Sequence, residues 1–391
     1  MQKKLNYKKI IIMIAILITG ILLYCGCQAN YQKNIVIGEQ NAVFLNDTEK
    51  EYICYFNDSK IFYTKVNQIV NNTYTIDDFC YYDRNTQNTQ KICELENASI
   101  QNMIDMGDNI FICVLYHRHK GKMMKLDLNK NTNEILYQWD SNSSVSYSDK
   151  WTDSNIVTFY TESTANEYIH HFLLFDNNTG KQKEFFKTVY DRKNNIGDIA
   201  SCYCFYHDNI VIYNQKYNGT DNVIRSLDFY DMDGNLKDSI VIDISESLEL
   251  SEEFEGEMID TIRNIHSCGN NIILSTQHKR ILFFNIDSGK LLDMKYYDIL
   301  HEPLAYYNTV NDNYAIFYNG ASKRTENNTI IIFNGNTGKF YHHNIVFEEP
   351  FEKQYIESIV LNDSGEMLIT TKQNLSSQKH YFIVNVSDIA Q

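Results

Sequence analysis

The fold is decided by a polar turn that recurs along the chain. Its first clear copy reads Leu174-Phe175-Asp176-Asn177-Asn178-Thr179-Gly180-Lys181. The turn returns as Phe284-Asn285-Ile286-Asp287-Ser288-Gly289-Lys290 and as Phe333-Asn334-Gly335-Asn336-Thr337-Gly338-Lys339, with weaker copies at 128–133 and 231–235. Asp or Asn followed by Gly supplies the positive φ that a tight hairpin turn requires. Apolar runs flank each copy, so each predicts two antiparallel strands joined by a turn.

A second kind of polar turn alternates with these copies along the chain and also occurs before the first copy and after the last. Its seven occurrences begin at Asn57, Gly107, Asp153, His207, Gly269, Asn311 and Asn362. They lie roughly 42 to 62 residues apart, with a mean near 50. Two turns for each such interval predict a repeat of four strands, which is the signature of a β-propeller blade.

The repeats predict an all-β, seven-bladed propeller, with six or eight blades as the alternatives. The last repeat has strands at 355–361, 366–371 and 380–386 and then ends without a fourth. A spare strand, Asn34-Ile35-Val36-Ile37-Gly38, lies at the other end of the domain, with 43–45 as an extension. We expect this N-terminal strand to complete the last blade and close the ring, because closure removes exposed sheet edges.

Composition agrees with a dense sheet protein. The chain has 391 residues, 43% of them hydrophobic, with 29 Tyr and 21 Phe but only 2 Pro. Aromatic residues favour strands, and the hydrophobic content excludes a wholly disordered chain. The formal net charge of −15 argues against a nucleic-acid-binding protein, since an acidic surface repels a polyanion.

The first residues have the features of an export signal. Lys3, Lys4, Lys8 and Lys9 precede an uncharged apolar run from Ile10 to Tyr24, and Cys25-Gly26-Cys27 follows. A positive start, an apolar run of this length and a small residue before the cut are typical of a secretory signal. Gly26-Cys27 resembles a bacterial lipobox, which implies lipid attachment at Cys27. An uncleaved anchor and a freely secreted protein are the alternatives.

The domain organisation follows from that signal. Residues 1–26 are expected to be a lipoprotein signal peptide, 27–33 a tether and 34–391 the propeller. Removal of the signal removes four lysines and lowers the formal net charge to about −19. We therefore expect a body on the outer face of the cytoplasmic membrane of a Gram-positive bacterium, held there by its lipid rather than by basic residues.

Seven cysteines lie beyond Cys27, so at least one of them stays unpaired. They are Cys54, Cys80, Cys93, Cys113, Cys202, Cys204 and Cys268. Most lie inside apolar, strand-like runs, where a cysteine acts as a small hydrophobic residue. Cys202 and Cys204 are two apart on a predicted strand and therefore share a face, but they lack the spacing of redox or zinc motifs.

The Asn-Thr-Gly-Lys turns at Asn177–Lys181 and Asn336–Lys339 resemble those of quinoprotein-like and YVTN/WD40-like β-propellers. In the quinoprotein-like repeats a Trp follows the turn and docks one blade on the next; here only Trp139 stands in such a place. The chain also resembles extracytoplasmic bacterial propeller lipoproteins, including outer-membrane assembly scaffolds. No residues match those that hold pyrroloquinoline quinone, so the resemblance implies no cofactor.

Catalytic and metal-binding motifs are scarce. The sequence has no P-loop, HExxH or GxSxG motif. The acidic run from Asp243 to Met258 leaves room for a short helix and is expected to be a solvated connection, because a linear run shows no convergence of ligands. Arg263, His301 and Glu302 are expected near the ends of the central channel. We predict no catalytic, cofactor-binding or metal residues.

Two hypotheses of function remain open. The first is a non-enzymatic binding or scaffold propeller, expected to be a monomer, for a protein, peptide or glycan of the cell envelope. Tyr217, Tyr306 and Tyr307 are its candidate ligand contacts, because Tyr supplies rigid amphipathic area. The alternative is a propeller hydrolase or lyase acting on envelope or imported polysaccharide. A convergent trio of His, Asp or Glu, and Arg at the end of the channel would favour the enzyme.

Overall fold

The computed structural model of the chain describes thirteen segments, and strands form nearly all of their regular structure. The described residues are 33–43, 51–71, 74–117, 120–139, 143–150, 152–219, 223–243, 261–276, 281–286, 290–295, 306–319, 328–373 and 379–390. Helix in these segments is confined to short 3₁₀ turns, η1 (Glu39–Asn41) and η3 (Val386–Asp388) among them. No helix among these residues is long and apolar enough to cross a membrane.

Most of the strands form up-and-down antiparallel sheets in chain order. The first sheet contains β3 (Glu51–Phe56), β4 (Lys60–Asn71), β5 (Tyr74–Asp83) and β6 (Asn88–Glu96). The second contains β7 (Ser99–Asp105), β8 (Ile110–His117), β9 (Lys120–Asp127) and β10 (Thr132–Gln138). A later four-stranded sheet contains β19 (Ile262–Cys268), β20 (Asn271–Thr276), β21 (Ile281–Asn285) and β22 (Lys290–Lys295).

Between these lies one continuous eight-stranded sheet. Its strands are β11 (Ser143–Lys150), β12 (Asn155–Ser163), β13 (Glu167–Asp176), β14 (Gln182–Asp191), β15 (Ile196–Tyr206), β16 (Asn209–Asn218), β17 (Val223–Tyr230) and β18 (Leu236–Val241). The strand pairing that joins the two halves is a short hairpin, in which Tyr190 and Asp191 pair with Gly197 and Ile196. Each half is therefore a four-strand meander like the other sheets.

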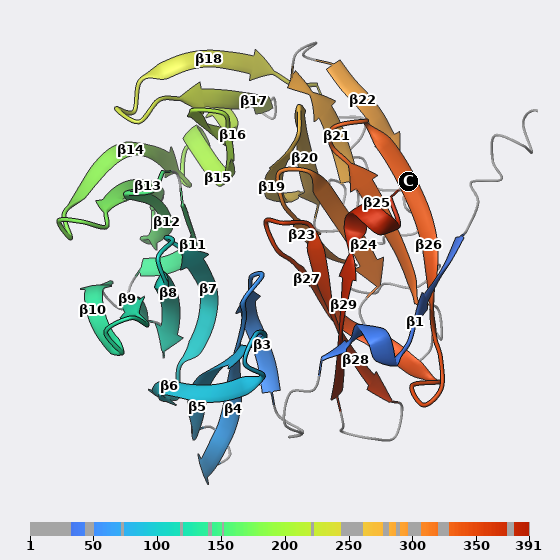
Figure 1. The fold of residues 1–391 in the computed structure, drawn as a ribbon. Coiled ribbons are helices and arrows are strands. Elements are labelled where there is room, and N and C mark those ends of the chain that lie inside the picture. The colour runs from blue at the N-terminus through green and yellow to red at the C-terminus, as the bar shows by residue number, and fades with distance from the viewer. Residues whose placement is uncertain are drawn as a thin grey trace, which may run out of the picture.

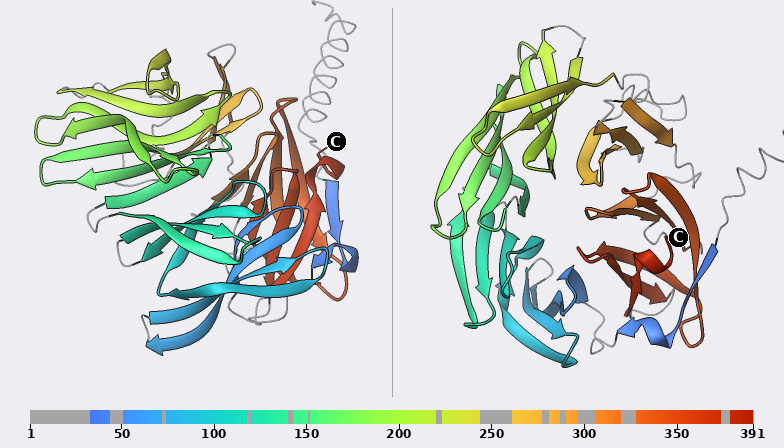
Figure 2. Two further views of the ribbon diagram at one scale, coloured as in Figure 1. Left: turned by 60° about the vertical axis from the view of Figure 1, so that its left-hand side comes forward. Right: turned by 45° about the horizontal axis from the view of Figure 1, so that its top comes forward.

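The N-terminal segment adds one strand to each of the last two sheets. A five-stranded sheet contains β23 (Tyr306–Val310), β24 (Tyr314–Asn319), β25 (Thr329–Asn334), β26 (Lys339–Phe347) and β1 (Lys33–Ile37). The final sheet contains β27 (Gln354–Leu361), β28 (Glu366–Gln373), β29 (Lys379–Asn385) and β2 (Ala42–Val43). The sheets stand around a central axis as in a β-propeller, with the C-terminal sheet beside the N-terminal one (Figures 1 and 2).

The position of the N-terminal strand differs from the expectation. Residues 34–38, with 43–45 as an extension, were predicted to complete the last sheet. The main strand, β1, instead runs parallel to β26, with Ile35 opposite Ile345, and only Val43 of the extension pairs with the last sheet. The fourth strand of the last sheet is instead β2, which pairs with β29. At this edge Ile35 and Ile37 are buried in the core between these two sheets.

The hydrophobic core is divided among the spaces between neighbouring sheets. Seven clusters of buried residues are found among the described segments, and each joins two successive four-strand meanders. One of them brings Phe56, Ile61 and Tyr63 of the first sheet against Leu368 and Tyr381 of the last. Both faces of each sheet are thus buried, which explains continuous apolar runs such as Ile330–Phe333.

Polar turns connect the same sheets at one end of the ring. The Asn311 side-chain amide donates to the backbone oxygen of Asn362 at 2.7 Å, and Asn362 donates to Asp58 Oδ1 at 3.2 Å. Asn57 in turn donates to Asp105 Oδ2 at 2.9 Å. All five residues lie in or beside the recurring polar turns that begin at Asn57, Gly107, Asn311 and Asn362, so these turns link neighbouring sheets by hydrogen bonds.

An ion pair crosses the junction between the first and last sheets. Arg84 donates from both terminal nitrogens to the Glu366 carboxylate, at 2.6 and 3.0 Å, and also to the Asn57 backbone oxygen. The two side chains are only 21% and 23% exposed. A partly buried, bidentate pair of this kind is stronger than an exposed one.

Arg84→Ala should lower the free energy of unfolding by about 2 kcal/mol, because it leaves the Glu366 carboxylate partly buried without its charged hydrogen bonds. The matched control is Lys130→Ala, which removes an ion pair to Asp127 whose lysine is 77% exposed. That change should have a much smaller effect, because water screens an exposed pair. Urea unfolding of both variants measures the difference, and equal losses would contradict a special role for the junction.

Ile37→Ala should lower the free energy of unfolding by about 2 to 4 kcal/mol, because the side chain is fully buried between two sheets. Val36→Ala changes the neighbouring residue of the same strand, whose side chain is 50% exposed. It should change stability by no more than about 0.5 kcal/mol. Denaturant titration compares the two, and a small loss for Ile37→Ala would show that β1 is not part of the core.

Candidate functional site

Most of the first strands of the four-strand meanders carry a β-bulge. These strands contact one another in succession: β11 contacts β7, β7 contacts β3, β3 contacts β27, β27 contacts β23, β23 contacts β19 and β19 contacts β15. The register of β15 shifts between Ala200 and Cys202, and that of β19 shifts between Ile262 and Asn264. β3, β7, β11 and β27 are interrupted in the same way. A bulge inserts one residue without a cross-strand partner and redirects its side chain.

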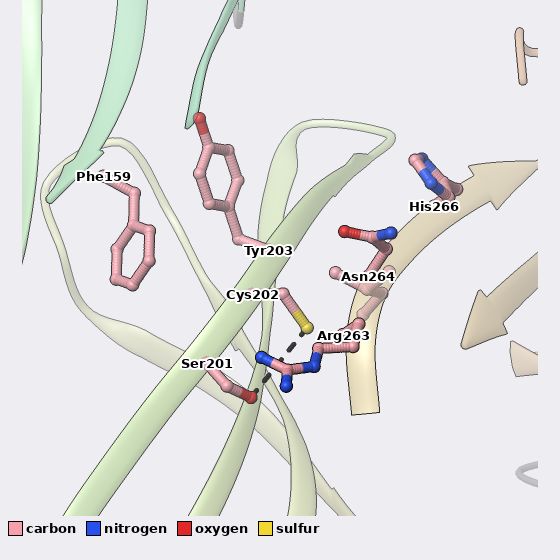
Figure 3. A pocket seen from close by; sticks show the side chains of 8 residues that line it. Phe159, Ser201, Cys202, Tyr203, Arg263, Asn264 and His266 are labelled. Carbon is pink, nitrogen blue, oxygen red and sulfur yellow. Dashed lines mark hydrogen bonds between the residues drawn. The ribbon is translucent and has the colours of Figure 1, made fainter. Parts of the chain in front are cut away.

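Two of these bulges face each other and help to form a pocket of about 110 Å³ (Figure 3). It is lined by Phe159 of β12, by Ser201, Cys202 and Tyr203 of β15, and by Arg263, Asn264, Ile265 and His266 of β19. The extra residues of the two bulges, Ser201 and Arg263, are both part of the lining. The pocket therefore depends on the bulges rather than on regular strand geometry.

The walls of the pocket differ in character. Tyr203 and Phe159 are buried and form an apolar side, and the Tyr203 hydroxyl is occupied by donating to the Val157 backbone oxygen at 3.0 Å. Arg263 is exposed, and its guanidinium extends toward Ser201 and Cys202 (Figure 3). Ser201 Oγ and Cys202 Sγ are 4.0 Å apart, at the limit of a sulfur hydrogen bond.

The titratable groups of the pocket are held in unreactive states. Burial raises the pKa of the Cys202 thiol to about 12, so it is not a thiolate at neutral pH. Burial lowers the pKa of His266 to about 4, so its imidazole is neutral there. None of the eight lining residues is Asp or Glu. The trio of His, carboxylate and Arg that would favour an enzyme is thus incomplete among the residues that line this pocket.

A second pocket, of about 270 Å³, lies where polar turns of the first, second and last sheets meet. It is lined by Tyr55, Asn57, Asp58, Ser59, Asp105, Asn362, Asp363 and Ser364. Burial raises the pKa of Asp363, and the nearby Asp312 and Asp105 raise it further. Among the described residues, no three His, Cys, Asp or Glu side chains are grouped so as to hold a metal ion.

The predicted ligand contacts do not come together in either pocket. Tyr217 lies on β16, half-buried, with its ring 5.0 Å from that of Tyr190. Tyr306 and Tyr307 lie on β23, which belongs to the five-stranded sheet rather than to the eight-stranded one. Their proposed role stays a prediction. Cys27, His301 and Glu302 lie outside the described residues, as does all but the first residue of the acidic run.

Sequence reasoning named two of the pocket residues, Arg263 near an end of the channel and Cys202 as a buried strand residue, and missed the other six. Ser201, Tyr203 and Asn264 are ordinary strand residues in the sequence, and nothing in it marks a bulge. Cys202 and Cys204 do share a face, as their spacing predicted, and both pack in the core cluster between β16 and β20. All seven cysteines of the described segments have free thiols.

Stability should fall as the pH drops from about 6.5 toward 4. Burial lowers the pKa of both His170 and His266 to about 4, from an ordinary value of 6.5. The unfolded chain therefore binds protons in this window that the folded chain does not, which favours unfolding. The wild type should lose at least about 2 kcal/mol more than a His170→Gln/His266→Gln double variant.

Urea unfolding at pH 7, 5.5 and 4.5 measures this difference. His207→Gln, at an exposed turn, is the control and should follow the wild type. Parallel pH profiles for the wild type and the double variant would show that the two imidazoles are not kept from protonation by burial.

Comparisons with known proteins identify the fold of the chain but assign it to no family. Similar solved structures include the β-propeller domain of the Trilobed protease from Pyrococcus furiosus, with a TM-score of 0.54 and 10% identity, covering 88% of this chain and 99% of that one. Another is an acylaminoacyl peptidase, with a TM-score of 0.55 and 9% identity, covering 86% of this chain and 52% of that one. A third is an oligogalacturonate lyase, with a TM-score of 0.50 and 10% identity, covering 87% and 89%. No protein-family model and no curated protein matches the chain. At these identities the likeness extends to the β-propeller fold alone.

Proposed function

We propose that this chain is a membrane-anchored, extracytoplasmic β-propeller of seven blades that binds a protein, peptide or glycan without transforming it. The blade number is supported by the seven core clusters, each between successive meanders, if the eight-stranded sheet is counted as two blades. The ring then closes where the first sheet packs on the last.

The observation that carries the binding role is the unreactive chemistry of the pocket between β15 and β19. Nucleophilic catalysis needs a nucleophile within hydrogen-bond reach of a base, and acid–base catalysis needs a group that titrates near the working pH. Here burial raises the pKa of Cys202 and lowers that of His266, so neither group changes charge near pH 7. Such a pocket can select a ligand, but it lacks the groups to act on one.

Anchoring is supported by the N-terminal sequence. Four lysines, an apolar run and Gly26-Cys27 precede the propeller, and only residues 28–32 separate Cys27 from the start of β1. Even when fully extended, those five residues reach no more than about 20 Å. A lipid on Cys27 would therefore hold the edge formed by β1 and β26 close to the membrane surface.

The alternative function, a hydrolase or lyase, has support only at the level of fold. Peptidases and an oligogalacturonate lyase share the propeller architecture. A propeller supports many unrelated activities, so chemistry has to be argued from the residues of the site. The pocket of Figure 3 offers no carboxylate for such chemistry, which is why binding is the preferred proposal.

Cys27→Ala should abolish incorporation of a labelled fatty acid and move the protein from the membrane fraction to the medium or soluble fraction. Cys25→Ala removes the neighbouring thiol and should leave both properties unchanged. Metabolic labelling and membrane fractionation in a bacterial host measure this. Continued labelling of the Cys27→Ala protein would show that the lipid, if any, is attached elsewhere.

The binding role is tested by presenting the purified chain with panels of peptides and oligosaccharides, and measuring binding and product formation in the same samples. We expect saturable binding of at least one class without any product. Release of a cleaved or unsaturated product at a rate proportional to the protein concentration would contradict the proposal and favour the enzyme.

A further inference from the structure

A histidine lies between two glutamates on the third four-strand meander, apart from both pockets. His171 of β13 is opposite Tyr160 of β12, and Tyr160 packs against the core cluster shared with the second sheet. Glu162 lies two residues beyond Tyr160 on β12, and Glu184 lies on β14 opposite Leu173. One ring nitrogen of the imidazole is close to each carboxylate.

A hydrogen bond fixes the tautomer of this imidazole. Nδ1 of His171 is 2.6 Å from Oε2 of Glu184. A carboxylate can only accept a hydrogen bond, so the ring proton lies on Nδ1. Nε2 of the neutral ring therefore carries a lone pair.

That lone pair faces the second carboxylate. Nε2 lies 3.5 Å from Oε2 of Glu162, and it is buried without a hydrogen-bond partner among the described residues. The whole histidine is only 9% exposed. A lone pair and a carboxylate oxygen repel each other, and a buried polar atom without a partner is costly. A positive ion between the two atoms removes both penalties.

The separation of the two atoms favours a metal ion over a proton. An N–H···O hydrogen bond joins atoms about 2.7 to 3.2 Å apart, and the separation here is 3.5 Å. Zn²⁺ binds imidazole nitrogen and carboxylate oxygen at about 2.0 to 2.2 Å with tetrahedral angles, which puts two such ligand atoms about 3.4 Å apart. We propose that Nε2 of His171 and Oε2 of Glu162 bind a divalent transition-metal ion, with Zn²⁺ as the best fit. This site is separate from the ligand pocket and does not depend on the binding role.

Glu184 supports the histidine rather than the ion. Ligating histidines commonly donate their second N–H to a carboxylate, which orients the ring and makes the ligating nitrogen more basic. The Tyr160 ring also stacks on the imidazole, with centroids 4.5 Å apart and planes at 7°. Among the residues that the structure describes, no third His, Cys, Asp or Glu makes this a three-ligand site. The other positions around the ion are left to water or to a donor from a bound molecule.

Charge and access both suit a divalent cation. Glu162 and Glu184 supply two negative charges, and the nearby Lys187 Nζ is 3.8 Å from Glu184 Oε1 on a side chain that is 55% exposed. Water screens an exposed charge of this kind. The Glu162 side chain is 44% exposed, so an ion can reach the site from solvent while the buried imidazole fixes its position.

The first experiment uses the full chain in detergent, stripped with a chelator and titrated by calorimetry with Zn²⁺ alone or with Mg²⁺. We expect saturable binding of Zn²⁺ and none of Mg²⁺, because Mg²⁺ prefers oxygen ligands to imidazole nitrogen. His171→Gln should abolish the binding. Glu162→Gln and Glu184→Gln should each weaken it by about tenfold or more.

The control is His207→Gln, which removes an exposed imidazole from a turn and should bind Zn²⁺ like the wild type. The melting temperature of each metal-free variant shows that it is folded. Glu162→Gln changes a partly exposed side chain, so it tests the site even if His171→Gln is destabilised. No saturable binding of Zn²⁺ by the wild type, or equal affinities for the wild type, His171→Gln and Glu162→Gln, would overturn the proposal.

The second experiment identifies the ligand atoms by X-ray absorption of the zinc-loaded chain. Nitrogen and oxygen neighbours at about 2.0 to 2.2 Å, with the multiple scattering of an imidazole, are expected in the wild type. The imidazole signal should be lost in His171→Gln and kept in His207→Gln. Sulfur neighbours at about 2.3 Å would overturn the proposal, because they would place the ion on cysteine thiolates.

Discussion

Face-to-face packing of successive sheets is the interaction on which the rest of the structure depends. Each cluster of buried residues draws its members from two neighbours, as where Ile273 and Phe283 of one sheet meet Phe317 and Phe333 of the next. No sheet has a core of its own, so the free energy gained from apolar burial is available only when its neighbours are in place. The junction between the first and last sheets then stabilises every other junction, because it removes the two exposed faces that an open array would leave.

The same constraint explains the pocket. Inner strands that converge on an axis have less room than the outer strands. A bulge bends such a strand and redirects one of its side chains. The extra residue of each bulge is directed away from regular pairing, which leaves Ser201 and Arg263 facing the space between β15 and β19. Specific side chains are thus presented at the axis as a by-product of fitting the sheets into a ring.

The repeat and its turns could be predicted from the sequence because they depend on local chemistry. The Asp-Asn-Asn-Thr-Gly and Asn-Gly-Asn-Thr-Gly turns lie between β13 and β14 and between β25 and β26, as expected, with Gly180 and Gly338 at φ of +66°. The sheet to which β1 is added could not be predicted. Ile35 and Ile37 lie on the same face of the strand, so the sequence indicates that this face is buried but not which sheet buries it. The pocket could not be predicted for a similar reason: a bulge arises from packing between distant segments. Arg263 was named only for its expected position near an end of the channel.

The route of the chain before the ring has a mechanical consequence. β1 is parallel to β26 over Lys33 to Ile37, and β2 then pairs with β29 of the neighbouring sheet. A pulling force applied through the residues before Lys33, along the strand direction, would act on the β1–β26 hydrogen bonds in shear. Bonds in shear share the load and yield together, whereas bonds that are peeled yield one by one. The N-terminal segment therefore forms a tension-resistant connection that distributes an external force over two sheets before it reaches the axis.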